Sequence, residues 1–207
     1  MMCVIIITGS DSEMISKLAK SIAHFFVIQN ITGEAEEVIY AYGMELLISD
    51  VLNTLIVLMI ALLSHTLPPA IIFVAVFVGL RHFVGGYHAN SHLSCMFTLV
   101  IVMLVFSYGI CNIPELYAKD FSVRFMLAAL PVIFCIAPIP HPNKPMSEEK
   151  ALKLKKKSRI LAAALSAAVI ALLIFHYHYL SLYIASGMLL SAVAALLGRF
   201  LNRGDNS

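Results

Sequence analysis

The sequence is short of charged residues. Only 13% of its 207 residues are Asp, Glu, Lys or Arg, about half of the ~25% that a soluble domain carries. Apolar residues make up 60% of the chain, and the mean hydropathy is +0.91. This composition excludes a soluble globular domain and indicates an integral membrane protein. We expect a single membrane domain over residues 1–207, with no separate soluble module.

Paired cysteines are also missing. The four cysteines, Cys3, Cys95, Cys111 and Cys135, show no paired spacing. A cysteine in an apolar run is most often a small buried hydrophobe, and that interpretation suits Cys111 and Cys135. The N-terminus has a short apolar run without a basic segment before it, so a cleaved signal peptide is not expected.

Long apolar runs dominate the rest of the chain. A transmembrane helix takes about 20 apolar residues, and we predict an all-α membrane protein with six such helices. Residues 10–30 have apolar side chains at a helical period. They predict an amphipathic helix, either in the membrane interface or packed against the protein itself. The predicted spans cover about residues 44–64, 68–87, 93–112, 121–140, 160–175 and 179–198.

Basic residues are spread unevenly between the predicted loops. The polar stretch 141–159 holds seven of the fourteen Lys and Arg residues. By the positive-inside rule it is a basic cytoplasmic loop. Counting spans from this loop places both termini and residues 82–92 in the cytoplasm too, and only Lys119 and Arg124 then fall outside.

Polar chemistry is concentrated in residues 81–95, which read RHFVGGYHANSHLSC between two apolar runs. Ionisable residues in a membrane chain are candidates for a functional site. The run from Ala70 to Leu80 holds only eleven uncharged residues before Arg81, which cover ~17 Å at ~1.5 Å per residue. We therefore expect residues 81–95 to lie below the headgroups, in a recess lined by protein.

The same stretch has the parts of a cysteine acyl-transfer site. The Gly85-Gly86 break ends the second span, so Cys95 falls near the first turn of the next helix. The positive end of the helix dipole there favours a thiolate. A histidine within reach would take the thiol proton, and the glycine amides or Arg81 could stabilise an oxyanion.

Residue spacing leaves the base and two other interpretations open. Helical geometry favours His92, three residues before Cys95 on the same face, whereas His88 reaches Cys95 only if the chain folds back. The three histidines and the cysteine of this stretch could instead ligate a metal, although no HExxH motif supplies the usual glutamate. The histidines and the arginine could also do no more than anchor a helix end at the headgroups.

Three polar residues interrupt the first predicted span: Glu45, Asp50 and Asn53. Glu45 and Asn53 share one helical face, which we expect to point into the helix bundle rather than to lipid. There they either satisfy one another or orient the site.

The pattern R-x6-H-x6-C of residues 81–95 resembles the active-site signature of the accessory gene regulator B (AgrB) family. Members are membrane cysteine endopeptidases that process precursors of cyclic quorum-sensing peptides. APIPHPNKPMSEEKALKLKKKSR (137–159) resembles the family's A-P, N-K-P, E and K loop, and YGMELLISDVLN (42–53) is a weaker match. Together the matches cover about residues 10–200 in the expected order.

The resemblance implies a role for individual residues. The nucleophile falls on Cys95, the general base on His88 and the essential arginine on Arg81, while His82 and His92 keep local hydrogen-bonding roles. Cys95 would attack a precursor peptide bond, release the C-terminal tail and form an acyl-thioester. A thiol or hydroxyl of the precursor would then close a thiolactone or lactone ring. A recessed site would keep out water, which would hydrolyse the thioester.

The basic stretch is expected to hold the acidic C-terminal tail of the precursor. We expect a bacterial plasma-membrane protein, and the distribution of basic residues puts its site toward the cytoplasm. No metal or other cofactor and no nucleic-acid partner are expected, and whether two copies form a homodimer stays open. The alternative is a small peptide or solute exporter or permease without covalent catalysis, but no duplicated halves or Gly/Pro-broken helix pairs are evident. The expected tail-binding residues are Lys150, Lys153, Lys155, Lys156 and Lys157.

Overall fold

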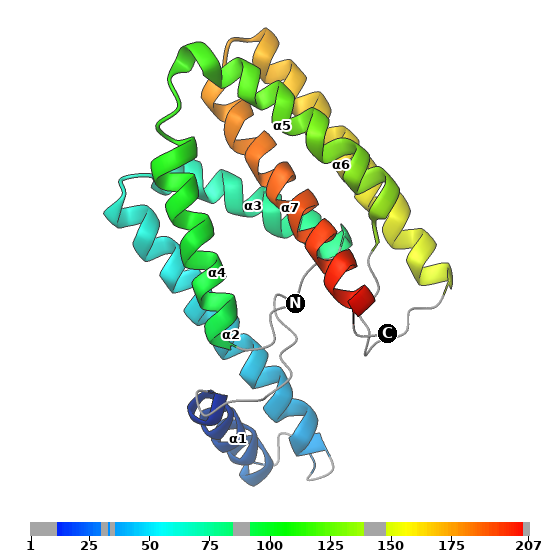
Figure 1. Ribbon diagram of the computed structural model, residues 1–207. Helices are drawn as coiled ribbons and strands as arrows, with labels where there is room; N and C mark the ends of the chain where they lie inside the picture. The colour runs from blue at the N-terminus through cyan, green and yellow to red at the C-terminus, as the bar shows by residue number, and fades with distance from the viewer. Residues whose placement is uncertain (1–11, 30–32, 34–35, 85–91, 139–147, 205–207) are drawn as a thin grey trace. The chain divides into compact units, whose positions relative to one another are not determined.

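The fold was obtained as a computed structural model, which describes residues 12–29, 33, 36–84, 92–138 and 148–204. For some helical residues within these ranges, among them Asp50, His92, Cys95 and Lys150, it describes the backbone alone. All regular structure in the described ranges is helical (Figure 1), which confirms the all-α prediction. The helices are α1 (Ser12–Ile28), α2 (Glu37–Leu63), α3 (Leu67–Val84), α4 (His92–Leu104), the π-helical η2 (Val105–Ile110), α5 (Glu115–Ile136), α6 (Glu148–Ile174) and α7 (His178–Gly204).

Three helices in the described part of the chain are long and apolar enough to cross a membrane. They are Leu67–Val84 of α3, Ala151–Ile174 of α6 and His178–Phe200 of α7. Shorter apolar helical segments cover Val51–Leu63 and Phe97–Ile110. Each predicted span contains helix, but the count of six spans and the cytoplasmic placement of the termini stay predictions.

The basic stretch is helical, which corrects the predicted loop over residues 141–159 for its part from residue 148 onward. α6 begins at Glu148, rather than at residue 160, so the basic residues from 150 to 159 lie on its first half. Glu, Lys, Ala and Leu, which make up most of this segment, are strong helix formers. Lys153 and Glu149 also form an i,i+4 ion pair of 2.6 Å, a spacing that supports helices.

The helices form two compact units. The first contains α1, α2 and most of α4, and the second contains α3, η2, α5, α6 and α7. The single domain over residues 1–207 stays a prediction.

In the first unit α1 packs against α2. Ala19 and Ala23 of α1 are buried, and His24 Nδ1 lies 3.3 Å from Glu37 Oε1 at the start of α2. Leu18 and Phe25 remain about half exposed. The predicted amphipathic helix therefore covers its own protein with one part of its apolar surface. Its position at the membrane interface stays a prediction.

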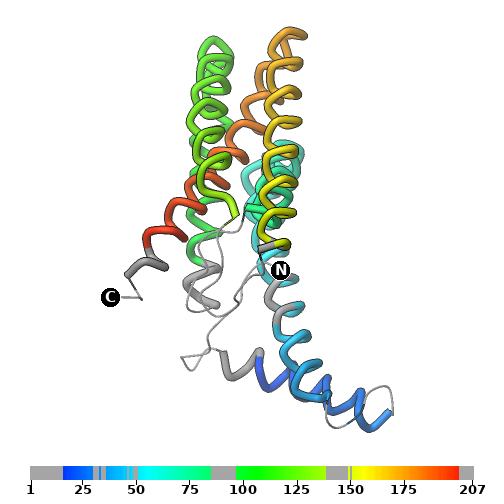
Figure 2. The backbone as a smooth tube through the Cα atoms, turned by 90° about the vertical axis from the view of Figure 1, so that its right-hand side faces the viewer, coloured from blue at the N-terminus to red at the C-terminus, as the bar shows by residue number. Residues whose placement is uncertain are grey.

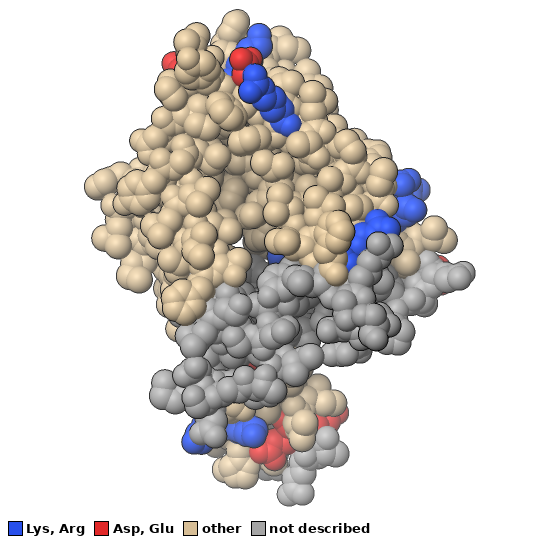
Figure 3. Space-filling view, viewed as in Figure 1, with Lys and Arg blue, Asp and Glu red and all other residues tan. Residues whose placement is uncertain are grey.

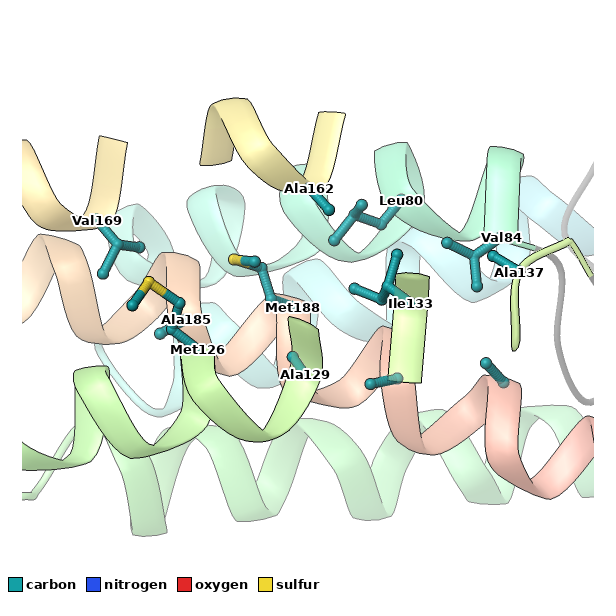
Figure 4. Close-up of a cluster of buried hydrophobic side chains, with 12 residues drawn as sticks. Leu80, Val84, Met126, Ala129, Ile133, Ala137, Ala162, Val169, Ala185 and Met188 are labelled. Atoms are coloured by element: carbon teal, nitrogen blue, oxygen red, sulfur yellow. The ribbon is translucent and has the colours of Figure 1, made fainter. Parts of the chain in front are cut away.

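In the second unit α7 packs against α3, α5 and α6. Figures 1 and 2 show α5 and α6 running along α7, with α3 crossing it. Side chains from all four helices meet in one core (Figure 4). This core includes Leu80 and Val84 of α3, Ile133 of α5, Val169 of α6 and Met188 of α7, all of them fully buried.

Small residues bring α7 very close to α3. A Cβ atom added to Gly187 would lie 2.9 Å from the carbonyl oxygen of Phe73 and 3.0 Å from the side chain of Val76. One turn later, the Ser191 hydroxyl donates to the carbonyl of Gly187 at 2.9 Å and approaches that of Phe77 at 3.4 Å. Such contacts are typical of helix packing in membranes, where small residues let backbones approach.

Candidate functional site

Arg81 lies in the last turn of α3, at the start of the candidate stretch. Its side chain is half-buried, and its guanidinium carbon lies 5.5 Å from the ring centroid of Phe77, a cation–π contact. Leu80 and Val84, on either side of it, are fully buried in the core of the second unit. The core therefore holds the helix end that carries Arg81.

Cys95 lies in the first turn of α4, which begins at His92. This agrees with the predicted helix start. The first four backbone N–H groups of a helix have no partner within it, so this turn is the positive end of the helix dipole. Gly85, Gly86 and His88 lie outside the described residues, as do the side chains of His92 and Cys95. Their catalytic roles stay predictions.

The basic half of α6 lies against the end of α3. Lys157 Nζ is 5.9 Å from the centroid of the Phe83 ring, and His82 meets the same ring edge-on with centroids 5.1 Å apart. Figure 3 shows Lys and Arg gathered over this half of α6. Positive charge is thus collected beside the helix end where the candidate stretch begins.

The predicted tail-binding lysines differ in their surroundings. Lys153 is exposed and pairs with Glu149, and Lys156 is exposed as well. Lys155 is half-buried, and Lys157 lies over Phe83. The side chain of Lys150 is outside the described residues.

Arg159, the last cation of this half of α6, faces α5. Its Nη2 donates a 2.8 Å hydrogen bond to the carbonyl of Phe134, and its guanidinium carbon lies 5.7 Å from the Phe134 ring centroid. Its Nε is buried and has no hydrogen-bond partner among the described residues. Lys157 and Arg159 are two residues apart, so they project to different sides of the helix.

The polar face of α2 is buried, as predicted. Glu45 is 8% exposed and Asn53 2%, whereas the neighbouring Leu47 and Leu55 are more than half exposed. The side chain of Asp50 lies outside the described residues. α2 belongs to the first unit, so the proposed role of these residues in orienting the site stays a prediction.

A metal site has no support within the described part of the chain. No group of three or more His, Cys, Asp or Glu side chains there is placed to hold a metal ion. Of the four side chains proposed as alternative ligands, that of His82 is described, whereas those of His88, His92 and Cys95 are outside that part. The prediction that the protein uses no metal or other cofactor therefore stays a prediction.

The aromatic contacts of the basic helix were not predicted from the sequence. Phe83 and Phe134 each lie under a cation of α6. In the sequence these contacts are indicated only by a phenylalanine near the end of each of two helices, α3 and α5, that pack against α6. The Gly187–Ser191 contact with α3 was not predicted either, and its signal was two small residues four positions apart.

In the part of the chain that the structure describes, all regular structure is helical and three helices are long and apolar enough to cross a membrane, which indicates a helical membrane protein. Among protein families, Accessory gene regulator B matches residues 13–195. The chain is 24% identical to the accessory gene regulator protein B of Staphylococcus lugdunensis, over 89% of this chain and 95% of that one. It is 27% identical to the putative AgrB-like protein 2 of Clostridium perfringens, over 79% of each chain, and 22% identical to a putative AgrB-like protein of Clostridium beijerinckii, over 68% of this chain and 71% of that one. No solved structure matches.

The chain belongs to the accessory gene regulator B family. Membership implies a role in the accessory gene regulator quorum-sensing system, in which this family is linked to the processing of an autoinducer peptide.

Proposed function

We propose that the protein is a membrane-embedded cysteine endopeptidase that cleaves the C-terminal tail from an autoinducer peptide precursor and promotes ring closure. The family match over residues 13–195 carries this proposal, because it contains the whole R-x6-H-x6-C stretch. The position of Cys95 in the first turn of α4 supports it, since a helix N-terminus favours the thiolate.

In the proposed reaction His88 takes the proton of the Cys95 thiol. The thiolate attacks a precursor carbonyl, and Arg81 or the amides of Gly85 and Gly86 stabilise the oxyanion. The peptide bond breaks, its nitrogen takes the proton from His88, and the tail leaves. The product is an acyl-thioester on Cys95. A thiol or hydroxyl of the precursor then attacks the thioester, which closes the thiolactone or lactone and restores the Cys95 thiol.

The acidic tail of the precursor is proposed to bind the basic half of α6. Lys157 supports this placement, because it lies against Phe83 at the end of α3, two residues from Arg81. A tail held there would lie near Arg81, the first residue of the candidate stretch. The binding would be mainly electrostatic and would weaken with salt, because charges at a surface are screened beyond ~8–10 Å.

Trapping the acyl-enzyme tests the proposal. Protein reconstituted in liposomes and incubated with precursor should form a covalent adduct on Cys95 that hydroxylamine releases, as detected by mass spectrometry. Cys95→Ala should abolish the adduct, while Cys111→Ala and Cys135→Ala serve as matched controls and should retain it. An adduct that persists in Cys95→Ala would overturn the assignment. Transport of uncleaved peptide by Cys95→Ala would favour the exporter.

A further inference from the structure

An apolar hollow lies between α5 and α6, on a part of the second unit that the proposed reaction does not use. Its volume is about 510 Å³, and it is open on its outer side. The lining is almost entirely apolar, and the hydroxyl of its one polar residue, Ser166, donates to the carbonyl of Ala162 in its own helix. The other lining residues are Leu130, Pro131 and Phe134 of α5 and Ala163, Ala167 and Ile170 of α6.

Small side chains account for the hollow. Ala163 and Ala167 are one turn apart on α6, and both are exposed. A leucine at either position would extend over the space that the two alanines leave. Pro131 lines the hollow from α5, where the helix runs through a residue that has no backbone N–H.

A cation lies one helical turn beyond one end of this hollow. Phe134, which lines it, is also the residue that Arg159 contacts through its ring and its carbonyl. Arg159 keeps a buried Nε that has no partner among the described residues. Residues 159, 163, 166 and 170 share one face of α6 because they follow helical spacing, so Arg159 lies on the face that lines the hollow. The site is therefore apolar along its length and cationic at one end.

Arg159 and the hollow together extend over about the depth of one leaflet of a bilayer. Arg159 and Ile170 are eleven residues apart, which is ~16 Å along a helix at ~1.5 Å per residue. The hydrocarbon core of a bilayer is ~30 Å thick, so one leaflet contributes ~15 Å. A groove of this length inside a span that is apolar enough to cross the membrane meets lipid tails first.

We propose that this hollow binds one anionic phospholipid, with an acyl chain along α5 and α6 and its phosphate on Arg159. Basic sites between membrane helices bind lipid headgroups in this way. The half-buried Arg159 guanidinium would supply the positive charge and a charge-assisted hydrogen bond for the phosphate. Lys157 lies on the other side of α6 over Phe83, so the lipid and the acidic peptide tail use different faces of one helix.

Native mass spectrometry with defined lipids tests this proposal. Purified full-length protein is titrated with dioleoyl-phosphatidylglycerol or with dioleoyl-phosphatidylcholine, which have identical chains and different headgroup charge. We expect each protein molecule to hold one phosphatidylglycerol and to prefer it over phosphatidylcholine by about fivefold or more. That ratio corresponds to the ~1 kcal/mol that one basic side chain near an anionic headgroup contributes. Arg159→Gln should remove that preference, and the matched control Lys157→Gln should keep it.

A second variant tests the hollow itself. Ala167→Phe should lower the binding of both lipids equally, since it fills the space for the chain without changing charge. It also carries the test if Arg159→Gln fails to fold, which circular dichroism would show. Three results would each overturn the proposal. The first is equal binding of the two lipids, and the second is an equal loss of phosphatidylglycerol preference in Lys157→Gln and Arg159→Gln. The third is unchanged lipid binding in Ala167→Phe.

Competition separates the lipid from other anions. Glycerol phosphate, which has the headgroup chemistry without the chains, should not displace bound phosphatidylglycerol at millimolar concentration. Displacement by glycerol phosphate would refute a site that depends on the acyl chain. Displacement by a soluble acidic peptide would assign the site to a peptide instead of a lipid.

Discussion

Lys157 Nζ of α6 lies 5.9 Å from the centre of the Phe83 ring at the end of α3. This contact joins two segments more than seventy residues apart in the sequence. One segment leads into the R-x6-H-x6-C stretch, and the other is the basic half of α6. Under the proposed function, a peptide tail bound by the lysines would therefore lie near Arg81 in the last turn of α3.

Charge-neutral replacements should weaken substrate binding more than they slow the chemistry. Replacing Lys155, Lys156 and Lys157 with Gln should raise KM for the precursor by about tenfold, at ~0.5 kcal/mol per exposed charge, with little change in kcat. Steady-state cleavage in proteoliposomes at low and high salt measures this. Lys119→Gln, on α5, is the matched control. Unchanged kinetics in the triple variant would leave the lysines a role in topology alone.

The choice of base should follow the family signature rather than helical spacing. His88→Ala should lower the rate of Cys95 adduct formation by about 10²–10⁴-fold, because that is what proton transfer by a positioned side chain contributes. His92→Ala should retain most of the rate, with any loss traceable to a weaker start of α4. Rapid-quench measurement of the adduct distinguishes the two. A dispensable His88 and an essential His92 would restore the helical assignment. Loss of activity on chelation, restored by zinc, would favour the metal site instead.

Gly187→Ala should destabilise the second unit. The new methyl group would meet the Phe73 carbonyl and the Val76 side chain at 2.9–3.0 Å, and overpacking of this kind costs about 1–3 kcal/mol. Thermal unfolding in detergent should show a lower Tm. Gly79→Ala on α3 is the matched control, because nothing lies within 4 Å of its added Cβ. The control should be neutral or stabilising by up to about 1 kcal/mol, as expected for alanine in a helix. Equal Tm values for the two variants would contradict close α3–α7 packing.

Cysteine labelling should find the two ends of the second unit on opposite sides of the membrane. The charge distribution places residue 150 in the cytoplasm and residue 118 outside. Ala118 is fully buried, so the probe belongs at Leu116, which is 80% exposed. Both variants are made in a protein without its native cysteines. A membrane-impermeant thiol reagent added to whole cells should label Leu116→Cys and should not label Lys156→Cys, although position 156 is also exposed on the protein. Labelling of Lys156→Cys from outside would invert the orientation, and labelling of both would contradict the span count.

Much of the fold could be predicted because its causes are local. The helix at residues 10–30, the helices within each predicted span and the start of α4 near Cys95 follow from apolar periodicity and from the Gly-Gly break. The first half of α6 could have been predicted as well. Its Glu, Lys, Ala and Leu residues favour helix, but their charge was interpreted as a loop.

Of the candidate site, too, one part could be predicted from the sequence and another part could not. The residue types and spacing of R-x6-H-x6-C are properties of the sequence and sufficed to indicate the family, which the match over residues 13–195 shows. The surroundings of Arg81, Lys157 and Arg159 could not be predicted, because each depends on an aromatic residue or a carbonyl contributed by helix packing.

The sequence by itself determined that this is an all-helical membrane protein with one concentrated polar stretch, since hydrophobicity and helix propensity act over short windows. Only the tertiary structure decided that Lys157 faces α3 and Arg159 faces α5, and that Gly187 lies against the backbone of α3. Those relationships depend on which helices are neighbours and how they are rotated. Both follow from packing between residues far apart in the chain.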